Sequence, residues 1–322
     1  MPIVPATPDN IAAAAAALRR GELVAFPTET VYGLGADATN SRAVARVFEA
    51  KGRPRFNPLI AHVADIAAAE RIAHFPAKAR RLAEAFWPGP LTLVLRRRPA
   101  GKISDFVTVG LETVAVRVPS HSIALALLRA VEVPLAAPSA NRSGHVSPTL
   151  ARHVLDDLGE APAFILDGGA TQHGLESTIL DASEDRVVQL RAGAIPADAI
   201  EAMLGGSMAR VAEAVDPATG EAMIAPGQLA SHYAPRAGLR LDAVDVRSGE
   251  ALLAFGGVVP ATSGPVFNLS PSGDLVEAAV NLFAALRALD AAAPKGIAVM
   301  PIPDEGLGEA INDRLKRGAA PR

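Results

Sequence analysis

The chain of 322 residues contains no cysteine at all. This absence excludes disulfide bonds, thiolate zinc sites, iron–sulfur clusters and a cysteine nucleophile. Aromatic residues are also scarce, at 4% of the chain, which argues against the stacking platforms that grip single-stranded nucleic acid. Several classes of redox and metal protein are thereby removed, and a dedicated RNA-binding surface is disfavoured.

An excess of positive charge is missing too. The formal net charge is −3, so the protein lacks the global basic field that nucleic-acid binders usually show, and any anion-binding site must be local. The apolar run Ala12–Leu18 is too short to cross a membrane and has no basic segment before it. We therefore expect a cytoplasmic protein without a membrane span.

Half of the residues are hydrophobic, which is enough to bury a sizeable core. Short apolar runs alternate with helical patterns, and this alternation predicts an α/β protein. Strands are expected at Leu23–Phe26, Leu59–Val63, Leu91–Leu95, Val114–Val118, Leu135–Ala137, Phe164–Leu166, Ser177–Leu180 and Val187–Leu190. Helices are expected at Asp9–Arg20, Ser41–Ala50, Pro76–Phe86, Ser120–Ala130, Thr149–Leu158 and Pro196–Leu204. The uneven spacing of the strands predicts a twisted mixed sheet flanked by helices.

Two domains are expected from the length, and the sequence changes character after residue 205. Residues 1–205 form the predicted main domain. Residues 206–237, which are interrupted by glycine and proline, are expected to form an interdomain linker. Residues 238–322 are expected to form a smaller, Rossmann-like α/β domain. Its predicted strands are 239–244, 252–257 and 296–301, and its predicted helices are Asp274–Leu289 and Gly308–Arg317.

The glycine-rich segment Gly33–Ala38 has the G-x-G-x-x-A spacing of a dinucleotide-binding fingerprint. Its context is poor, because residues 27–30 separate it from the preceding strand and the next helix begins near Ser41. We interpret the segment as a structural turn and reject NAD binding.

A compact cationic cluster, Lys51, Arg53 and Arg55, follows the second predicted helix. Lysine and arginine are favoured at helix C-termini, so the cluster could be an ordinary solvated helix end. Gly52 and Pro54 restrict the backbone, however, and Asn57-Pro58 leads directly into an apolar strand. Cations held next to the end of a strand are suited to bind a polyphosphate or a carboxylate. This segment alone supports a ligand-binding site and an ordinary solvated helix end equally.

Other polar groups enter or leave predicted strands. Ser139 and Asn141 follow one strand, in a loop that could donate to phosphate oxygens or be merely capped. Arg117 lies inside an apolar run, where a structural ion pair and a ligand contact are equally plausible. His62 ends another apolar run, and the seven histidines show no metal-binding pattern.

Seven segments occur together in this order: PTETVYGLGADA, KGRPRFNPLIAHV, WPGPLTLVL, AVRVPSH, APSANRSG, ESTILD and RAGAI. With these segments the chain resembles the YrdC-type threonylcarbamoyl-AMP synthases, and PGQLASHYAP and GLGEAINDRLKRGA resemble the long, two-domain form of that family. The resemblance covers nearly the whole chain, and residues 241–272 contribute little to it.

This resemblance implies the fold, a concave cationic cavity, and a nucleotidyltransferase reaction. L-threonine, bicarbonate and ATP would give threonylcarbamoyl-AMP and pyrophosphate, with Mg²⁺ carried by ATP and no metal held by the protein itself. A separate transferase would pass the threonylcarbamoyl group to tRNA. No protein nucleophile is needed; the chemistry requires positioning and charge neutralisation.

The resemblance also implies a division of labour among the site residues. Lys51 and Arg53 are expected to be catalytic, and residues of the two strand-end loops and of the later strands are expected to contact ATP. The predicted ATP-binding set is Lys51, Arg53, Asn57, Ser139, Asn141, Ser177 and Arg191. The predicted threonine-binding set is Thr28, Tyr32, His62 and Arg117, and the predicted lid is His232-Tyr233.

Two other functions remain possible at this point. One is an RNA-binding module, whose affinity would fall steeply with salt; net charge and scarce aromatics disfavour it, and stable direct tRNA binding is not expected. The other is a regulatory domain that binds a nucleotide without turnover.

Overall fold

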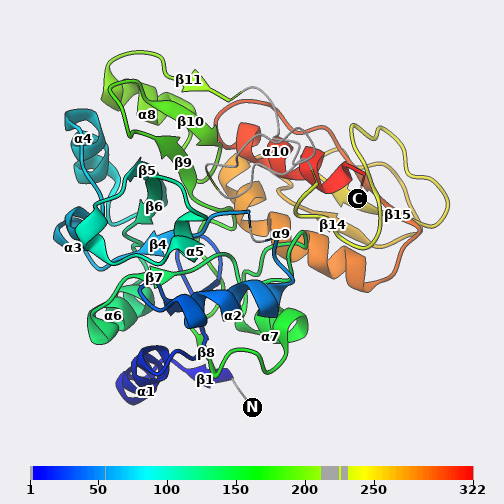
Figure 1. Cartoon of the computed structure of the whole chain (residues 1–322). Coiled ribbons are helices and arrows are strands. Elements are labelled where there is room, and N and C mark those ends of the chain that lie inside the picture. Colours follow the sequence, from blue (N-terminus) through cyan, green and yellow to red (C-terminus); the bar gives the residue numbers. More distant parts are fainter. Residues whose placement is uncertain (1–2, 55, 212–224, 226–230, 322) are drawn as a thin grey trace.

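The predicted mixed α/β fold is confirmed by a computed structural model, which describes residues 3–54, 56–211, 225 and 231–321. The larger sheet has eleven strands in the described part, in the order β1-β8-β2-β3-β7-β4-β6-β5-β9-β10-β11, with parallel and antiparallel pairs (Figure 1). Its strands are β1 Ile3–Pro5, β2 Val24–Phe26, β3 Gly33–Asp37, β4 Ile60–His62, β5 Leu91–Arg96, β6 Thr113–Arg117, β7 Leu135–Ala136, β8 Phe164–Asp167, β9 Thr178–Asp181, β10 Val188–Arg191 and β11 Ala209–Arg210.

Eight α-helices accompany this sheet in the described part of the chain. They are α1 Pro8–Arg19, α2 Ser41–Lys51, α3 Ile66–Ile72, α4 Ala77–Phe86, α5 Asp105–Thr108, α6 Ser122–Val131, α7 Ala151–Leu158 and α8 Ala197–Leu204. Several begin where the sequence supplies a cap: the side chains of Thr7 and Asn40 accept backbone N–H groups at the starts of α1 and α2. The six predicted helices therefore match observed helices to within about two residues at each end.

At the β2 end of the sheet, alternate residues pack on opposite faces. Val24 and Phe26 lie in a core with α1 and α6, whereas Ala25 lies in a core with α2 and α7. Strand geometry sends successive side chains to opposite faces, so this period of two buries both sides of the sheet under helices.

In the part of the chain that the structure describes, helices of the first domain cover only one face of the other half of the sheet. Val114 and Val116 of β6 point into a core with α3, α4 and α8. Ala115 and Arg117, in the alternate positions of the same strand, therefore point the other way. Ala115 packs on that side with Ile60 and with Ala225 of the linker. This face, free of helices of the first domain, is where polar side chains gather.

The smaller domain contains a four-stranded parallel sheet in the order β12-β15-β13-β14. Its elements are β12 Leu239–Arg240, β13 Glu250–Ala254, β14 Val266–Asn268, α9 Leu275–Ala291, β15 Gly296–Val299 and α10 Leu307–Ala319. Figure 1 shows it, coloured yellow to red, beside the large sheet and away from α3 and α4. Val31 and Val146 of the first domain share its core, so the two domains are packed together.

The interpretation of Gly33–Ala38 as a turn is wrong: Gly33–Asp37 forms β3, paired antiparallel with β2. The reason is the ring of Phe26 on the neighbouring strand. A Cβ at Gly35 would lie 2.8 Å from a ring carbon of Phe26, so glycine is required there for close packing rather than for turning. The predicted linker runs from residue 206 to 237, and its residues 212–224 and 226–230 lie outside the described residues.

Candidate functional site

A cavity of about 50 Å³ lies on the face of the large sheet that the helices of the first domain leave free. Nine of the predicted site residues line it: Thr28, Arg53, His62, Arg117, Ser139, Ser177, Arg191, His232 and Tyr233. The remaining lining residues are Thr30, Val31, Gly33, Ile60, Ala137, Pro138 and Glu176. Residues from across the first domain and from the linker thus converge on one small space.

Lys51 and Arg53 are held by the end of α2. Gly52 adopts the left-handed conformation, with φ at 59°, and ends the helix so that the two flanking cations are both buried. The Lys51 Nζ donates to the backbone oxygens of Ser139, at 2.6 Å, and Asn141. The guanidinium of Arg53 donates to the side-chain oxygen of Asn57 at 2.5 Å. Lys51, Asn57 and Asn141 thus stand just behind the cavity lining.

Among the described residues, neither Lys51 nor Arg53 forms a hydrogen bond or an ion pair with a carboxylate. In the described part of the chain, the hydrogen-bond acceptors of Lys51 and Arg53 are neutral amide oxygens. Burial, followed by repulsion from Arg53, holds the pKa of Lys51 well below its usual value, and burial lowers the pKa of Arg53 to about 10. Buried positive charge without an anionic partner is costly, so the arrangement is one that an anion would stabilise.

Arg117 forms a buried ion pair, which is one of its two predicted roles, and it also lines the cavity. Its contact with a ligand stays a prediction. Its Nη2 donates to Glu29 at 2.5 Å, and the exposed fractions of the two side chains are 4% and 0%. Burial opposes ionisation of Glu29, but the charge and hydrogen bond of Arg117 hold its pKa below the usual value. The pair orients the arginine at the edge of the cavity.

Ser177 and Arg191 meet at the start of β9 and the end of β10. The Nη2 of Arg191 donates to the backbone oxygen of Ser177 at 2.8 Å and to its hydroxyl at 3.1 Å. The Ser177 hydroxyl also lies 2.7 Å from that of Thr92. The preceding residue, Glu176, lines the same wall and accepts from Arg314 of α10 at 2.9 Å.

Three predicted threonine-binding residues occupy different positions. His62 lines the cavity, and burial, followed by the charge of Arg117, lowers its pKa to about 3, so it is neutral near pH 7. The Thr28 hydroxyl donates to the Val31 carbonyl at 2.6 Å, which ties it to its own turn. Tyr32 is not among the lining residues; its hydroxyl donates to the backbone oxygen of Gly169 at 2.8 Å. Its place in a threonine pocket stays a prediction.

The predicted lid residues, His232 and Tyr233, line the cavity from the linker side. His232 and Tyr233 are both buried, with ring centroids 4.0 Å apart. Tyr233 has a φ of 61°, an uncommon conformation for a non-glycine residue and one that is found at functional sites. Burial and the nearby cations hold the pKa of His232 well below its usual value. The next residue, Ala234, donates its amide to Gly144 at 2.9 Å, which ties the segment to the loop after Asn141.

Sequence reasoning missed the two carboxylates of the site. Glu29 was passed over inside PTET, although an acid next to an apolar strand needs a partner, and Arg117 in an apolar run needs one as well. Glu176 lies in the segment ESTILD, where the sequence predicts no role for it, because its partner Arg314 is 138 residues away in the other domain. Thr30 also lines the cavity, and its buried hydroxyl lies 2.8 Å from that of Thr28. Nothing in the sequence pattern around Thr30 indicates this position.

Within residues 3–54, 56–211, 225 and 231–321, no group of three or more acidic or histidine side chains is placed to hold a metal ion. In the same residues, no helix is both long and apolar enough to cross a membrane.

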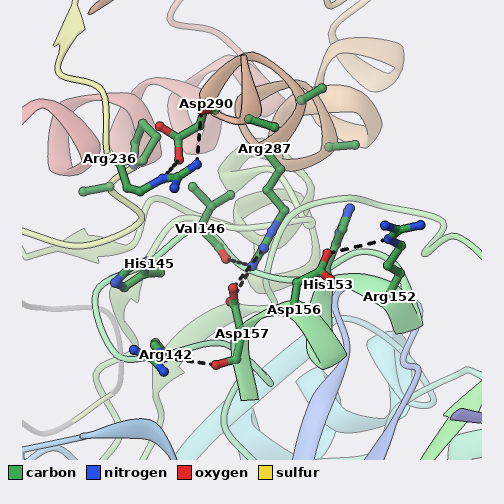
Figure 2. A pocket seen from close by; sticks show the side chains of 15 residues that line it. Arg142, His145, Val146, Arg152, His153, Asp156, Asp157, Arg236, Arg287 and Asp290 are labelled. Atoms are coloured by element: carbon green, nitrogen blue, oxygen red, sulfur yellow. Dashed lines mark hydrogen bonds and ion pairs between the residues drawn. The ribbon is translucent and has the colours of Figure 1, made fainter. Parts of the chain in front are cut away.

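A second, larger hollow of about 610 Å³ lies between the two domains, and we call it the interdomain groove (Figure 2). It is lined by Arg142, His145, Val146, Arg152, His153, Asp156, Asp157, Ala234, Pro235, Arg236, Ala284, Arg287, Ala288, Asp290 and Ala291. Its charged groups are largely paired with one another: Arg287 with Asp157 at 2.7 Å and Arg236 with Asp290 at 3.1 Å.

Comparison with known proteins matches both domains to families. A family model for Sua5, YciO and YrdC, described as "Telomere recombination", matches residues 16–193. A second model, described as the C-terminal domain of threonylcarbamoyl-AMP synthase, matches residues 195–320.

The chain is similar over almost its full length to curated proteins named threonylcarbamoyl-AMP synthase. One from Pyrococcus abyssi is 43% identical over 97% of this chain and 95% of its own length. One from Bacillus subtilis is 43% identical over 97% of this chain and 94% of its own. A crystal structure of P. abyssi Sua5 complexed with L-threonine aligns with a TM-score of 0.88 at 40% identity, covering 97% of this chain and 95% of that one.

Proposed function

This chain belongs to the threonylcarbamoyl-AMP synthase family, and on that premise we propose that it is an L-threonylcarbamoyladenylate synthase. It joins L-threonine, bicarbonate and ATP to give threonylcarbamoyl-AMP and pyrophosphate. The observation that carries the proposal is the burial of Lys51 and Arg53 against neutral acceptors at the cavity, because ATP, bicarbonate and the carbamate of threonine are anions that need uncompensated cations.

The reaction has two steps. The threonine amine displaces water from bicarbonate and becomes a carbamate. A carbamate oxygen then attacks the α-phosphorus of ATP, and pyrophosphate leaves with the electron pair of the broken P–O bond. Both steps need oriented reactants and neutralised charge rather than a protein nucleophile.

The chain's own residues supply these needs as follows. Lys51 and Arg53 neutralise the triphosphate and the carbamate, with Asn57, Ser139 and Asn141 fixing the loops around them. Ser177 and Arg191 hold the nucleotide on the β9–β10 side. His62 is neutral, so it can hydrogen-bond the threonine hydroxyl, and Arg117 binds the threonine carboxylate with its orientation set by Glu29.

Mg²⁺ enters with ATP in this proposal. The two carboxylates of the site, Glu29 and Glu176, are each paired with an arginine, so the side chains present suit a metal held by phosphate oxygens rather than by protein. When bound, the ion would neutralise phosphate charge.

The cavity must open before it can bind substrates. Its volume of about 50 Å³ compares with roughly 300–1,000 Å³ for a pocket that holds a small molecule. His232 and Tyr233 occupy its mouth and act as a lid that moves aside for ATP and returns. Exclusion of water protects the carbamate and the mixed anhydride from hydrolysis.

The product then leaves for a separate transferase, which modifies the tRNA adenosine beside the anticodon. We place the enzyme in the cytoplasm, where tRNA and ATP are available, and expect no stable binding of tRNA to this chain.

The test is pyrophosphate release by the purified protein with ATP, Mg²⁺ and bicarbonate, with and without L-threonine. Threonine-dependent release is expected, together with a product of the mass of threonylcarbamoyl-AMP. Absence of threonine-dependent release would sink the assignment. Binding of RNA that falls steeply between 50 and 200 mM salt would instead favour the RNA-binding alternative.

A further inference from the structure

The C-terminal domain places one arginine inside the wall of the catalytic cavity. Arg314, from the middle of α10, has an exposed fraction of 0%. Its Nε donates to Glu176 at 2.9 Å, and its Nη1 donates to Asp313 at 2.8 Å. A fully buried guanidinium is costly unless it is paired, and here its partner is a carboxylate that lines the cavity of the other domain.

The same guanidinium lies against the lid. The Cζ of Arg314 is 5.1 Å from the centre of the Tyr233 ring, within the range of a cation–π contact. The Tyr233 ring also stacks on Phe283 of α9, with centroids 5.8 Å apart and an angle of 22°. The Tyr233 hydroxyl finds no hydrogen-bond partner among the described residues. The ring is therefore positioned by two side chains of the C-terminal domain rather than by its hydroxyl.

Glu176 has a second hydrogen-bond partner, Ser147, whose loop is held by another arginine of the C-terminal domain. The Ser147 hydroxyl donates to Glu176 at 2.5 Å, and Ser147 lies in the loop that leads to α7. Arg287 of α9 clamps this loop by donating to the backbone oxygen of Val146 and to the carboxylate of Asp157 (Figure 2). Both oxygens of Glu176 are thus held by contacts that depend on the C-terminal domain.

We propose that Arg314 is a positioning residue of the catalytic cavity, which neutralises and orients Glu176 and holds Tyr233 in the closed position. The C-terminal domain then acts on catalysis through one side chain that touches both a wall and the lid of the site. This inference rests on the proposed synthase function for its activity readout.

The physical need for such a residue follows from the charges around the cavity. Glu176 shares the cavity with Arg53 and Arg191, which the proposed function assigns to the binding of ATP. An unpaired carboxylate at this place would repel a triphosphate and would form ion pairs with the cations that ATP needs. Arg314 removes that interference from behind the wall, without itself occupying the space for the substrate.

The experiment compares Arg314→Met, the double variant Arg314→Met/Glu176→Gln, and the matched control Arg240→Met. Arg240 also pairs with a glutamate, Glu250 at 2.6 Å, but it lies in the C-terminal sheet and lines neither the cavity nor the groove. We measure kcat and KM for ATP well below each variant's melting temperature, and hydrogen exchange of residues 231–237.

Arg314→Met is expected to lower kcat/KM on the order of 100-fold, since small misplacements of catalytic groups cost about this much. Removing the carboxylate as well should restore about 10-fold of that loss, because the uncompensated charge is gone. Exchange of the Ala234 amide should become at least about 10-fold faster in Arg314→Met. Arg240→Met should leave all three quantities close to those of the unaltered protein.

A double variant no more active than Arg314→Met would overturn the neutralising role, and unchanged exchange at residues 231–237 would overturn the hold on the lid. If Arg314→Met does not fold, Arg314→Gln, which can still donate to Glu176, takes its place in the same comparison. Hydrogen exchange needs no turnover. A protein without threonine-dependent pyrophosphate release therefore fails the proposed function while the contact with the lid is still tested.

Discussion

The cavity and the interdomain groove differ in volume and in how their charges are paired. The larger of the two has fewer features of a ligand-binding site. The groove encloses about 610 Å³ and the cavity about 50 Å³. Yet Arg236 and Arg287 of the groove pair with the carboxylates of Asp290 and Asp157, whereas Lys51 and Arg53 are buried against neutral oxygens. The volume of the groove reflects incomplete packing between the two domains. Buried charge without an anionic partner instead indicates where a charged ligand is expected to bind.

This difference has an energetic basis. An ion at the surface keeps most of its hydration and gains little from a partner, so its presence says little about function. An ion in the interior loses hydration and persists only when partners or a ligand compensate for it. The comparison can be tested by removing charges from each region, and the expected effects decrease from the cavity to the groove.

Arg53→Ala should give the largest effect. Loss of a fixed cation that meets phosphate charge is expected to reduce kcat on the order of 10³-fold, as the loss of a preorganised donor does elsewhere, and Lys51→Ala should behave alike. The assay is threonine-dependent pyrophosphate release. Arg42→Ala is the control, because Arg42 is an exposed cation of α2, the helix that ends at Lys51. Near-normal turnover of either cavity variant in a folded protein would contradict the interpretation of the cationic cluster.

The sequence predicted the elements whose patterns are local. Apolar runs of four or five residues became strands such as β5 and β6, and capped helical patterns became helices such as α2 and α4. In these segments hydrophobic period, caps and turn residues all favour the same structure. The position of Arg117 on the open face also follows from the period of two along its strand.

What the sequence could not supply were contacts between distant segments. The sequence predicts a turn at Gly33–Ala38, where the structure has a strand, because Gly35 is needed for the close packing of the Phe26 ring on the neighbouring strand. Glu29 pairs with an arginine 88 residues away, and Glu176 with one 138 residues away. Arg314 lies within the predicted helix Gly308–Arg317, and nothing near it in the sequence indicates its partner. Partners such as these are fixed by tertiary packing, on which a single sequence carries no local signal.

Arg117→Met should give the next largest effect, and it acts on stability. The substitution leaves Glu29 as a buried carboxylate without its partner, which typically costs about 3 kcal/mol or more. Urea unfolding at pH 7 measures the loss. The double variant Arg117→Met/Glu29→Gln should recover part of it, since the uncompensated charge is removed. A single variant as stable as the unaltered protein would show that water reaches Glu29 and that the pair is not truly buried.

His62 provides a smaller effect that depends on pH. Its pKa in the folded protein is lowered to about 3, mainly by burial, so the folded state stays neutral while the unfolded chain gains a proton below about pH 6.5. Stability is therefore lost as the pH falls. Between pH 6 and pH 5 the unaltered protein should lose about 1 kcal/mol more of its unfolding free energy than His62→Gln does. Parallel pH profiles of the two proteins would contradict a buried neutral His62.

The smallest effect is expected in the groove, from Arg152→Ala. Arg152 lies 3.9 Å from Asp156 one helical turn away, and the exposed fractions of the two side chains are 84% and 56%. An exposed pair of this kind contributes about 0.5 kcal/mol or less, so urea unfolding should shift by no more than that. Pyrophosphate release should stay within about twofold of normal, because the charge is hydrated whether or not its partner is present. A large loss of activity in this variant would place a ligand in the groove. It would also contradict the conclusion that buried and uncompensated charge, rather than open volume, indicates the ligand-binding site of this protein.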